Sequence, residues 1–132
     1  MIDTAALNVL TTIPVGASPH SIAVHPNHPL AANVNYDANS VTEIDANTLK
    51  VVTTIPAGKN PRDIVWAPDG RFAYVVNEGS NNVSVIDAAT SQVTTTIPTG
   101  ESPTSIGVLP NSQRAYVTNV DSGTLSVLKL TG

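Results

Sequence analysis

The sequence predicts an all-β fold, and three observations indicate it. Hydrophobic residues make up 41% of the 132 residues and charged residues only 12%, a balance typical of a folded chain rather than a disordered one. Ten prolines and eight glycines supply many turns. Short runs rich in Val, Ile and Thr lie between these turns, and no helical period of ten residues or more occurs. We therefore expect short antiparallel strands throughout.

A repeat of 42 residues organises the whole chain. The dipeptide Ile-Asp occurs at residues 2–3, 44–45 and 86–87, and each occurrence follows the last by 42 residues. The tripeptide Thr-Ile-Pro recurs in the same way, and no gap is needed to align the three copies. The repeat therefore predicts three abutting units, residues 2–43, 44–85 and 86–127, in a single domain that spans residues 1–132.

Each unit contains four strand-like runs. In the second predicted blade, which starts in the second unit and ends in the third, they cover residues 62–67, 71–77, 82–87 and 91–98, with turn-forming residues between them. Four strands in a unit of 42 residues is the size of a β-propeller blade. We therefore expect three four-stranded blades, with strands a to d running from a central channel outward.

Two segments carry a family resemblance. The sequences Ala-Tyr-Val-Val-Asn at residues 73–77 and Ala-Tyr-Val-Thr-Asn at residues 115–119 resemble the motif of the YVTN β-propeller repeat family. The resemblance covers essentially the whole chain and implies a propeller fold. Propellers of this family occur in cell-surface and periplasmic proteins, and their relatives include cofactor-carrying dehydrogenase subunits and lactonase-like enzymes. The resemblance therefore implies an exported or cell-surface parent and leaves several functions open, although this chain shows no signal peptide.

The strand order predicts that one chain cannot close a ring. The chain opens with the end of a c strand and a d strand at about residues 7–14, and it closes with a c strand at about residues 124–130. Closed propellers typically have about four to eight blades, so three blades are too few. We expect a homodimer of six blades, in which each chain donates its opening d strand to the last blade of its partner. The alternatives are a fragment of a longer propeller and a chain cut to test self-assembly.

Recurrent glycine and asparagine positions predict structural roles. Glycine ends each d strand at residues 16, 58 and 100, where we expect a positive φ. Asparagine closes each b strand at residues 35, 77 and 119, where its side chain can bond to nearby backbone.

Residues that differ between the units are candidates for function. The residue after each d–a proline is expected near the channel mouth, and it is His20, Arg62 or Thr104 in the three units. Lys59 lies nearby in sequence. These donors predict a site for a small anionic ligand or an acidic peptide, and the alternative is a solvated polar rim.

The first unit also departs from the core pattern. Asn33 and Glu43 each occupy a position that is valine in the other two units. We expect these two residues to face each other across the b–c hairpin, either as a locally satisfied polar pair or as part of a polar pocket.

The histidines predict no metal site. His20 precedes the first a strand, whereas His25 and His28 flank the turn at its other end, about 16 Å away. One ion cannot bind all three, and the remaining pair would bind a metal only weakly. The chain also has no cysteine, no Gly-x-Ser-x-Gly elbow, no zincin motif and no phosphate loop, so we assign no catalytic residue and no cofactor.

Charge and hydropathy exclude two classes of partner. The net charge is −4, so the basic footprint of a nucleic-acid-binding protein is absent, and no apolar run is long enough to span a membrane. The leading interpretation is a non-catalytic scaffold or protein-binding module that self-associates and uses its channel mouth. The alternatives are a fragment of an enzymatic propeller, lactonase-like or dehydrogenase-associated, and a purely structural or engineered repeat unit.

Overall fold

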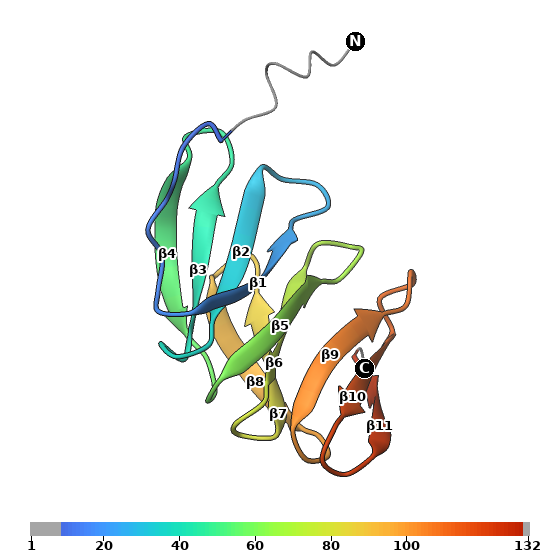
Figure 1. The fold of residues 1–132 in the computed structure, drawn as a ribbon. Helices are drawn as coiled ribbons and strands as arrows, with labels where there is room; N and C mark the ends of the chain where they lie inside the picture. Colours follow the sequence, from blue (N-terminus) through green and yellow to red (C-terminus); the bar gives the residue numbers. More distant parts are fainter. Residues whose placement is uncertain (1–8, 131–132) are drawn as a thin grey trace.

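A computed structural model describes residues 9–130, and these residues form eleven strands (Figure 1). The first blade contains β1 (Pro19–Val24), β2 (Leu30–Asn35), β3 (Ser40–Asp45) and β4 (Lys50–Pro56). The second contains β5 (Pro61–Trp66), β6 (Phe72–Asn77), β7 (Asn82–Asp87) and β8 (Gln92–Pro98). The third contains β9 (Pro103–Val108), β10 (Arg114–Asn119) and β11 (Thr124–Lys129).

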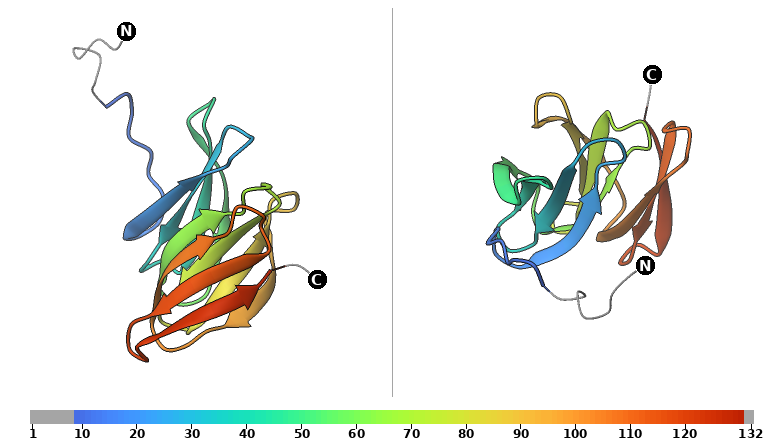
Figure 2. Two further views of the ribbon diagram at one scale, coloured as in Figure 1. Left: turned by 90° about the vertical axis from the view of Figure 1, so that its right-hand side faces the viewer. Right: turned by 90° about the horizontal axis from the view of Figure 1, so that it is seen from above.

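The strands form three antiparallel sheets that follow one another in chain order. The first two sheets have the orders β1-β2-β3-β4 and β5-β6-β7-β8, and the third has the order β9-β10-β11. The second sheet lies between the first and the third, and the inner strands β1, β5 and β9 are neighbours (Figures 1 and 2). This arrangement confirms the predicted all-β propeller architecture of three blades, which do not close into a ring.

The described part of the predicted opening d strand, residues 9–14, pairs with no other strand of residues 9–130. Residues 9–14 belong to no strand, and the side chains of Val9 and Leu10 are 78% and 90% exposed. The rest of that predicted strand, and the end of a c strand expected before it, lie outside the described residues. The third sheet therefore has three strands in the part of the chain that the structure describes. No helix among residues 9–130 has the length and hydrophobicity to cross a membrane.

The hydrophobic core lies between neighbouring blades. One cluster joins the first two blades and includes Val34, Trp66 and Val75. A second cluster joins the second and third blades and includes Tyr74, Val76 and Val117. Alternate residues of each strand point toward opposite neighbours, so the middle blade buries both of its faces. Trp66 is the largest side chain of the first cluster and is only 6% exposed.

Two of the three recurrent asparagines, Asn35 and Asn77, bind the backbone as predicted, whereas Asn119 binds only side chains and its Oδ1 has no hydrogen-bond partner. Asn77 is fully buried, and its Oδ1 accepts a hydrogen bond from the backbone N–H of Gly58 at 3.1 Å. Asn35 accepts the equivalent bond from Gly16 at 3.2 Å. Asn35 and Asn77 thereby fix the starts of the connections that lead into β1 and β5.

The prediction of positive φ at the d-strand glycines is wrong. Among the described glycines only Gly70 and Gly123 have positive φ. Close approach is the reason for glycine at Gly58, because a Cβ there would lie 2.5 Å from Ser80 Oγ and 2.7 Å from Asn77 Cγ. The left-handed residues of the connections come two positions later, at Ser18, Asn60 and Ser102.

This contact predicts the effect of a methyl group. Gly58→Ala is expected to destabilise the protein by about 1–2 kcal/mol, because the new Cβ forces the buried Asn77 side chain to shift. Gly107→Ala is the matched control, since nothing lies within 4 Å of a Cβ at that position. Urea denaturation of the two variants at equal protein concentration measures the difference. Equal stabilities would show that the connection tolerates a Cβ.

The expected pairing of Asn33 with Glu43 is also wrong. The register pairs Asn33 with Thr42 and Glu43 with Ala32, one position away from the predicted alignment. Side chains alternate along a strand, so the one-residue difference places the two polar groups on opposite faces of the first blade. Glu43 shares its face with Ala32, whose side chain packs toward the second blade. Asn33 faces the opposite, open side.

Candidate functional site

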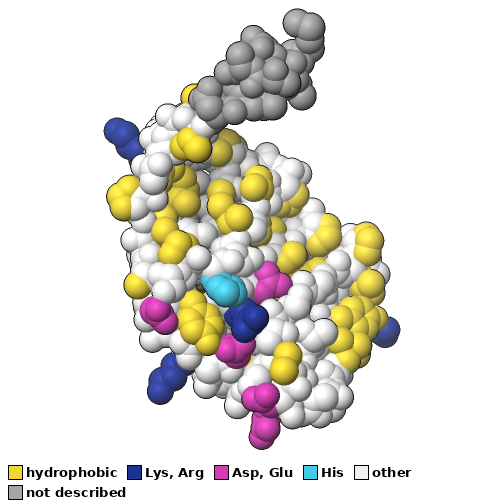
Figure 3. Space-filling view, in the orientation of Figure 1, with side chains coloured by type: hydrophobic (Ala, Val, Ile, Leu, Met, Phe, Trp, Pro, Cys, Tyr) yellow, Lys and Arg dark blue, Asp and Glu magenta, His cyan; other side chains and the backbone are white. Residues whose placement is uncertain are grey.

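The d–a and b–c connections meet at one end of the blades, and we call this end the channel mouth because it would border the channel of a closed ring. His20 and Arg62 are the second residues of the inner strands β1 and β5. Tyr36 and Glu78 directly follow β2 and β6. Figure 3 shows a histidine gathered with basic and acidic side chains on this face. We call His20, Tyr36, Arg62 and Glu78 the mouth cluster.

Glu78 connects the mouth cluster across two blades. Its Oε1 accepts a hydrogen bond from the Tyr36 hydroxyl at 2.7 Å, and its Oε2 pairs with Arg62 Nη1 at 2.7 Å. The rings of His20 and Tyr36 lie 5.7 Å apart in a tilted arrangement. Both carboxylate oxygens are therefore engaged, and the carboxylate holds a phenol and a guanidinium in fixed positions.

The same contacts set the charge state of the cluster. The hydrogen bond to the Glu78 carboxylate raises the pKa of Tyr36 above its ordinary value, because ionising the phenol would place two anions side by side. The Arg62 side chain is 41% exposed. It uses one of its five N–H groups on Glu78, which leaves donors for a ligand.

Two predicted site residues lie apart from this cluster. Thr104 Oγ1 is 3.1 Å from Thr118 Oγ1 in the third blade. Lys59 is exposed, and its backbone N–H donates to Ser80 Oγ at 3.1 Å. The structure thus brings His20 and Arg62 together with Glu78, and it leaves Thr104 and Lys59 on the rim.

One carboxylate on the middle inner strand bonds to groups on all three inner strands. Asp63 accepts hydrogen bonds from Ser21 Oγ at 3.0 Å and from the backbone N–H of Ile106 at 3.1 Å. Its own neighbour Ile64 donates another backbone bond at 2.9 Å. Asp63 therefore links all three inner strands, and it fixes the spacing of the strands that carry the mouth cluster.

Glu78 was not identified from the sequence, although a signal for it exists. Tyr36 and Glu78 are 42 residues apart, so they occupy the same position in consecutive units. The comparison of units that selected His20 and Arg62 would also have selected this pair.

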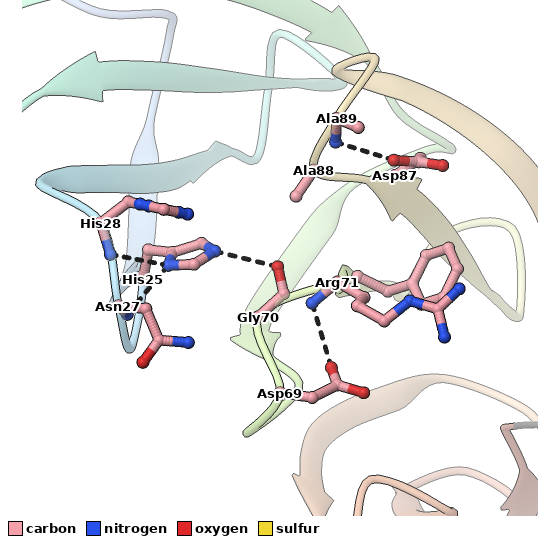
Figure 4. Close-up of a pocket in the computed structure, with 10 residues that line it drawn as sticks. His25, Asn27, His28, Asp69, Gly70, Arg71, Asp87, Ala88 and Ala89 are labelled. Carbon is pink, nitrogen blue, oxygen red and sulfur yellow. Dashed lines mark hydrogen bonds between the residues drawn. The ribbon is translucent and has the colours of Figure 1, made fainter.

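A hollow of about 440 Å³ lies among the turns at the other end of β1 and β5, away from the mouth cluster. Figure 4 shows His25, Asn27 and His28 on one side of it and Asp87 and Ala88 on the other. Both nitrogens of the buried His25 are engaged there. Its Nδ1 accepts the backbone N–H groups of Asn27 and His28, so Nε2 carries the proton that is donated to the Gly70 carbonyl at 2.9 Å.

This geometry removes His25 as a metal ligand, because ligation requires an unshared nitrogen lone pair. His28 is then a single exposed donor next to it. Within residues 9–130, no three His, Cys, Asp or Glu side chains are grouped closely enough to hold an ion.

The sequence matches a known propeller family. The family model described as lactonase, seven-bladed β-propeller, matches residues 15–99, which is more than half of the chain. A search of curated proteins finds no significant match.

Solved structures agree with this architecture. Hydrazine synthase of Kuenenia stuttgartiensis is 28% identical, with a TM-score of 0.82, over 92% of this chain and 36% of that one. A functionally unknown protein from Desulfotomaculum acetoxidans is 26% identical, with a TM-score of 0.75, over 91% of this chain and 44% of that one. A proposed 6-phosphogluconolactonase from Bacteroides fragilis is 19% identical, with a TM-score of 0.79, over 90% and 36%, and this likeness concerns the fold alone. The chain spans less than half the length of each.

Proposed function

The chain belongs to the lactonase family of seven-bladed β-propellers, and from this premise we propose that it is a three-blade binding module whose channel mouth takes a small carboxylate ligand. The observation that carries this proposal is the mouth cluster, in which Glu78 holds Arg62 in place and leaves its remaining N–H donors exposed. A planar guanidinium with paired donors suits a carboxylate. His20 and the Tyr36 ring border the same position.

The charges around the mouth favour a ligand with one anionic group. Arg62 and Lys59 are cationic, whereas Asp37, Glu78, Glu101 and Asp121 are anionic, so acidic groups outnumber basic ones and the surface does not attract anions at long range. Recognition then depends on directed hydrogen bonds rather than on long-range attraction. A hydroxy acid, with one carboxylate and several hydroxyl groups, fits this balance better than a polyanion.

Titration with D-gluconate tests the proposal. We expect saturable binding that weakens about 10-fold or more in Arg62→Ala, since a charge-assisted hydrogen bond contributes about 1.5–3 kcal/mol. Arg71→Ala is the matched control, because Arg71 lies over the Phe72 ring at the other end of the blades. Calorimetry of the wild type and both variants gives the affinities. Equal affinities in all three, or no saturable binding, would contradict the proposal.

A second candidate function is lactone hydrolysis in a completed ring. The family match favours it, and so does the contact between the Glu78 carboxylate and the Tyr36 hydroxyl, which places a hydrogen-bond acceptor and a donor beside each other. Water would add to the lactone carbonyl and the ring C–O bond would break, giving a hydroxy acid. Release of acid from D-glucono-δ-lactone above the uncatalysed rate, and its loss in Glu78→Gln, would favour this function over simple binding.

Two finer assignments belong to the same proposal. The motifs at residues 73–77 and 115–119 support membership of the YVTN-type repeats, with units at residues 2–43, 44–85 and 86–127. The open sheets support self-association, in which the chain acts as one half of a ring.

A further inference from the structure

The third blade exposes a strand edge that is covered in the other two blades. In those blades β4 pairs with β3, and β8 pairs with β7. In the third blade, β11 takes the place of β3 and β7, and within residues 9–130 it pairs only with β10. Its apolar side chains Leu125 and Val127 are 56% and 57% exposed. An edge of this kind is open to the addition of another strand.

Residues 9–14 have the sequence of the strand that this edge lacks. Their Thr-Thr-Ile-Pro ending occurs again at the ends of β4 and β8. Ile13 already lies against its own first blade, where it lines a hollow of about 350 Å³ together with Val15, Ile22 and Ile44. The segment is therefore placed as the outer strand of a blade that would precede the first one. The second blade separates it from the third blade of the same chain (Figure 2).

We propose that residues 9–14 of one copy pair with β11 of a second copy, and that the open face of that third blade docks on the first blade of the donor. The registers of the two complete blades define the pairing. Val41 pairs with Ile55 and Val83 with Ile97, so Leu125 pairs with Ile13. Glu43 pairs with Thr53 and Val85 with Thr95, so Val127 pairs with Thr11.

Polar residues on the two open faces support the same partner. Between the blades of one chain, valines occupy the corresponding positions: Val34 with Val75 in one core cluster, and Val76 with Val117 in the other. On the two open faces these positions hold Thr118 and Asn33 instead. Asn33 is only 5% exposed, and its Oδ1 has no hydrogen-bond partner. A hydroxyl at the docked interface satisfies a buried amide that valine leaves unpaired.

Ring closure by two copies requires each blade to turn further than in the family. The rotation about the ring axis from one blade to the next is about 60° in a ring of six blades and about 51° in a ring of seven. The inference rests on the self-association in the proposed function and not on ligand binding at the channel mouth. Gluconate titration and the experiments below can therefore fail independently.

Disulfide cross-linking tests the register, because the chain contains no cysteine of its own. Thr11→Cys with Val127→Cys places directly opposite residues within disulfide range only if the proposed strands pair. Thr12→Cys with Val127→Cys is the matched control, since Thr12 points to the other face. We expect a covalent dimer from the first variant under oxidising conditions and little from the second. Equal yields, or only monomer from both, would overturn the proposed pairing.

A double-mutant cycle tests the docked face. We expect Thr118→Val to weaken dimer formation about 10-fold, because it leaves the buried Asn33 Oδ1 unpaired, and Asn33→Val to weaken it less, because the Thr118 hydroxyl keeps Thr104 Oγ1 as a partner. The double variant is expected to recover most of the affinity, since it restores the valine pair found between the other blades. Strictly additive losses would show that the two residues do not meet. Circular dichroism confirms that the variants remain folded.

Discussion

Asn77→Ala is expected to lower the free energy of unfolding by about 2–4 kcal/mol, the largest effect of any single substitution considered for this chain. Asn77 is fully buried, and its Nδ2 donates to Ser84 Oγ at 2.8 Å and to Asn82 Oδ1 at 2.9 Å. Its Oδ1 accepts the Gly58 N–H. Alanine removes the partner of the buried Ser84 hydroxyl and of the Gly58 N–H, whereas Asn82 Oδ1 keeps Ser80 Oγ as a partner.

Urea denaturation measures this loss, and Asn119→Ala provides the matched control. Asn119 occupies the equivalent position in the third blade, but its buried Oδ1 has no hydrogen-bond partner. The Gly100 N–H donates to Ser126 Oγ instead, at 3.3 Å. The control should therefore lose less stability than Asn77→Ala. An equal or greater loss in the control would show that the bond to the connecting loop contributes little.

Asp63→Ala is expected to cost about 2–3 kcal/mol, because charge-assisted hydrogen bonds to the inner strands are lost together. The carboxylate accepts one hydrogen bond from Ser21 Oγ in the first blade and another from the Ile106 N–H in the third. Without it, the N–H of Ile106 lacks its acceptor and the inner strands lose their common link. We also expect weaker gluconate binding, since these strands carry His20 and Arg62.

Asp37→Ala is the control for this prediction. Asp37 is an exposed carboxylate at the channel mouth that accepts a hydrogen bond from the Ser18 hydroxyl. Its loss is expected to change stability by no more than about 0.5 kcal/mol, as for most surface substitutions. Thermal unfolding of both variants at one protein concentration makes the comparison. A stability loss as small for Asp63→Ala as for the control would contradict the linking role of Asp63.

The repeat made the fold predictable from the sequence, because three copies report the same strand pattern. In the second blade the predicted runs at residues 71–77 and 82–87 agree within one residue with β6 and β7. The pairing register of β2 with β3 was harder to predict. A shift of one residue in the b–c turn decides whether Asn33 and Glu43 lie on the same face of the sheet or on opposite faces. Turn geometry decides this, and left-handed Asn39 in that turn marks the tight connection.

The candidate site was only partly predictable, because its contacts join residues from different units. The positions of His20 and Arg62 follow from the prolines before them, whereas the role of Glu78 depends on the distance between two blades. The reason for glycine at Gly58 likewise depends on a side chain that arrives from another strand. Interactions between blades, rather than within a strand, were the part that sequence patterns could not supply.

The mass of the full chain in solution tests the central claim most directly. The account predicts that two copies associate through their open blades and enclose one channel, with a mouth cluster from each copy. Sedimentation equilibrium over a range of concentrations should therefore give twice the chain mass of 13.7 kDa. A stable monomer of 13.7 kDa at every concentration would contradict the account, because the exposed strand edge and both open faces would then have no partner in a second copy.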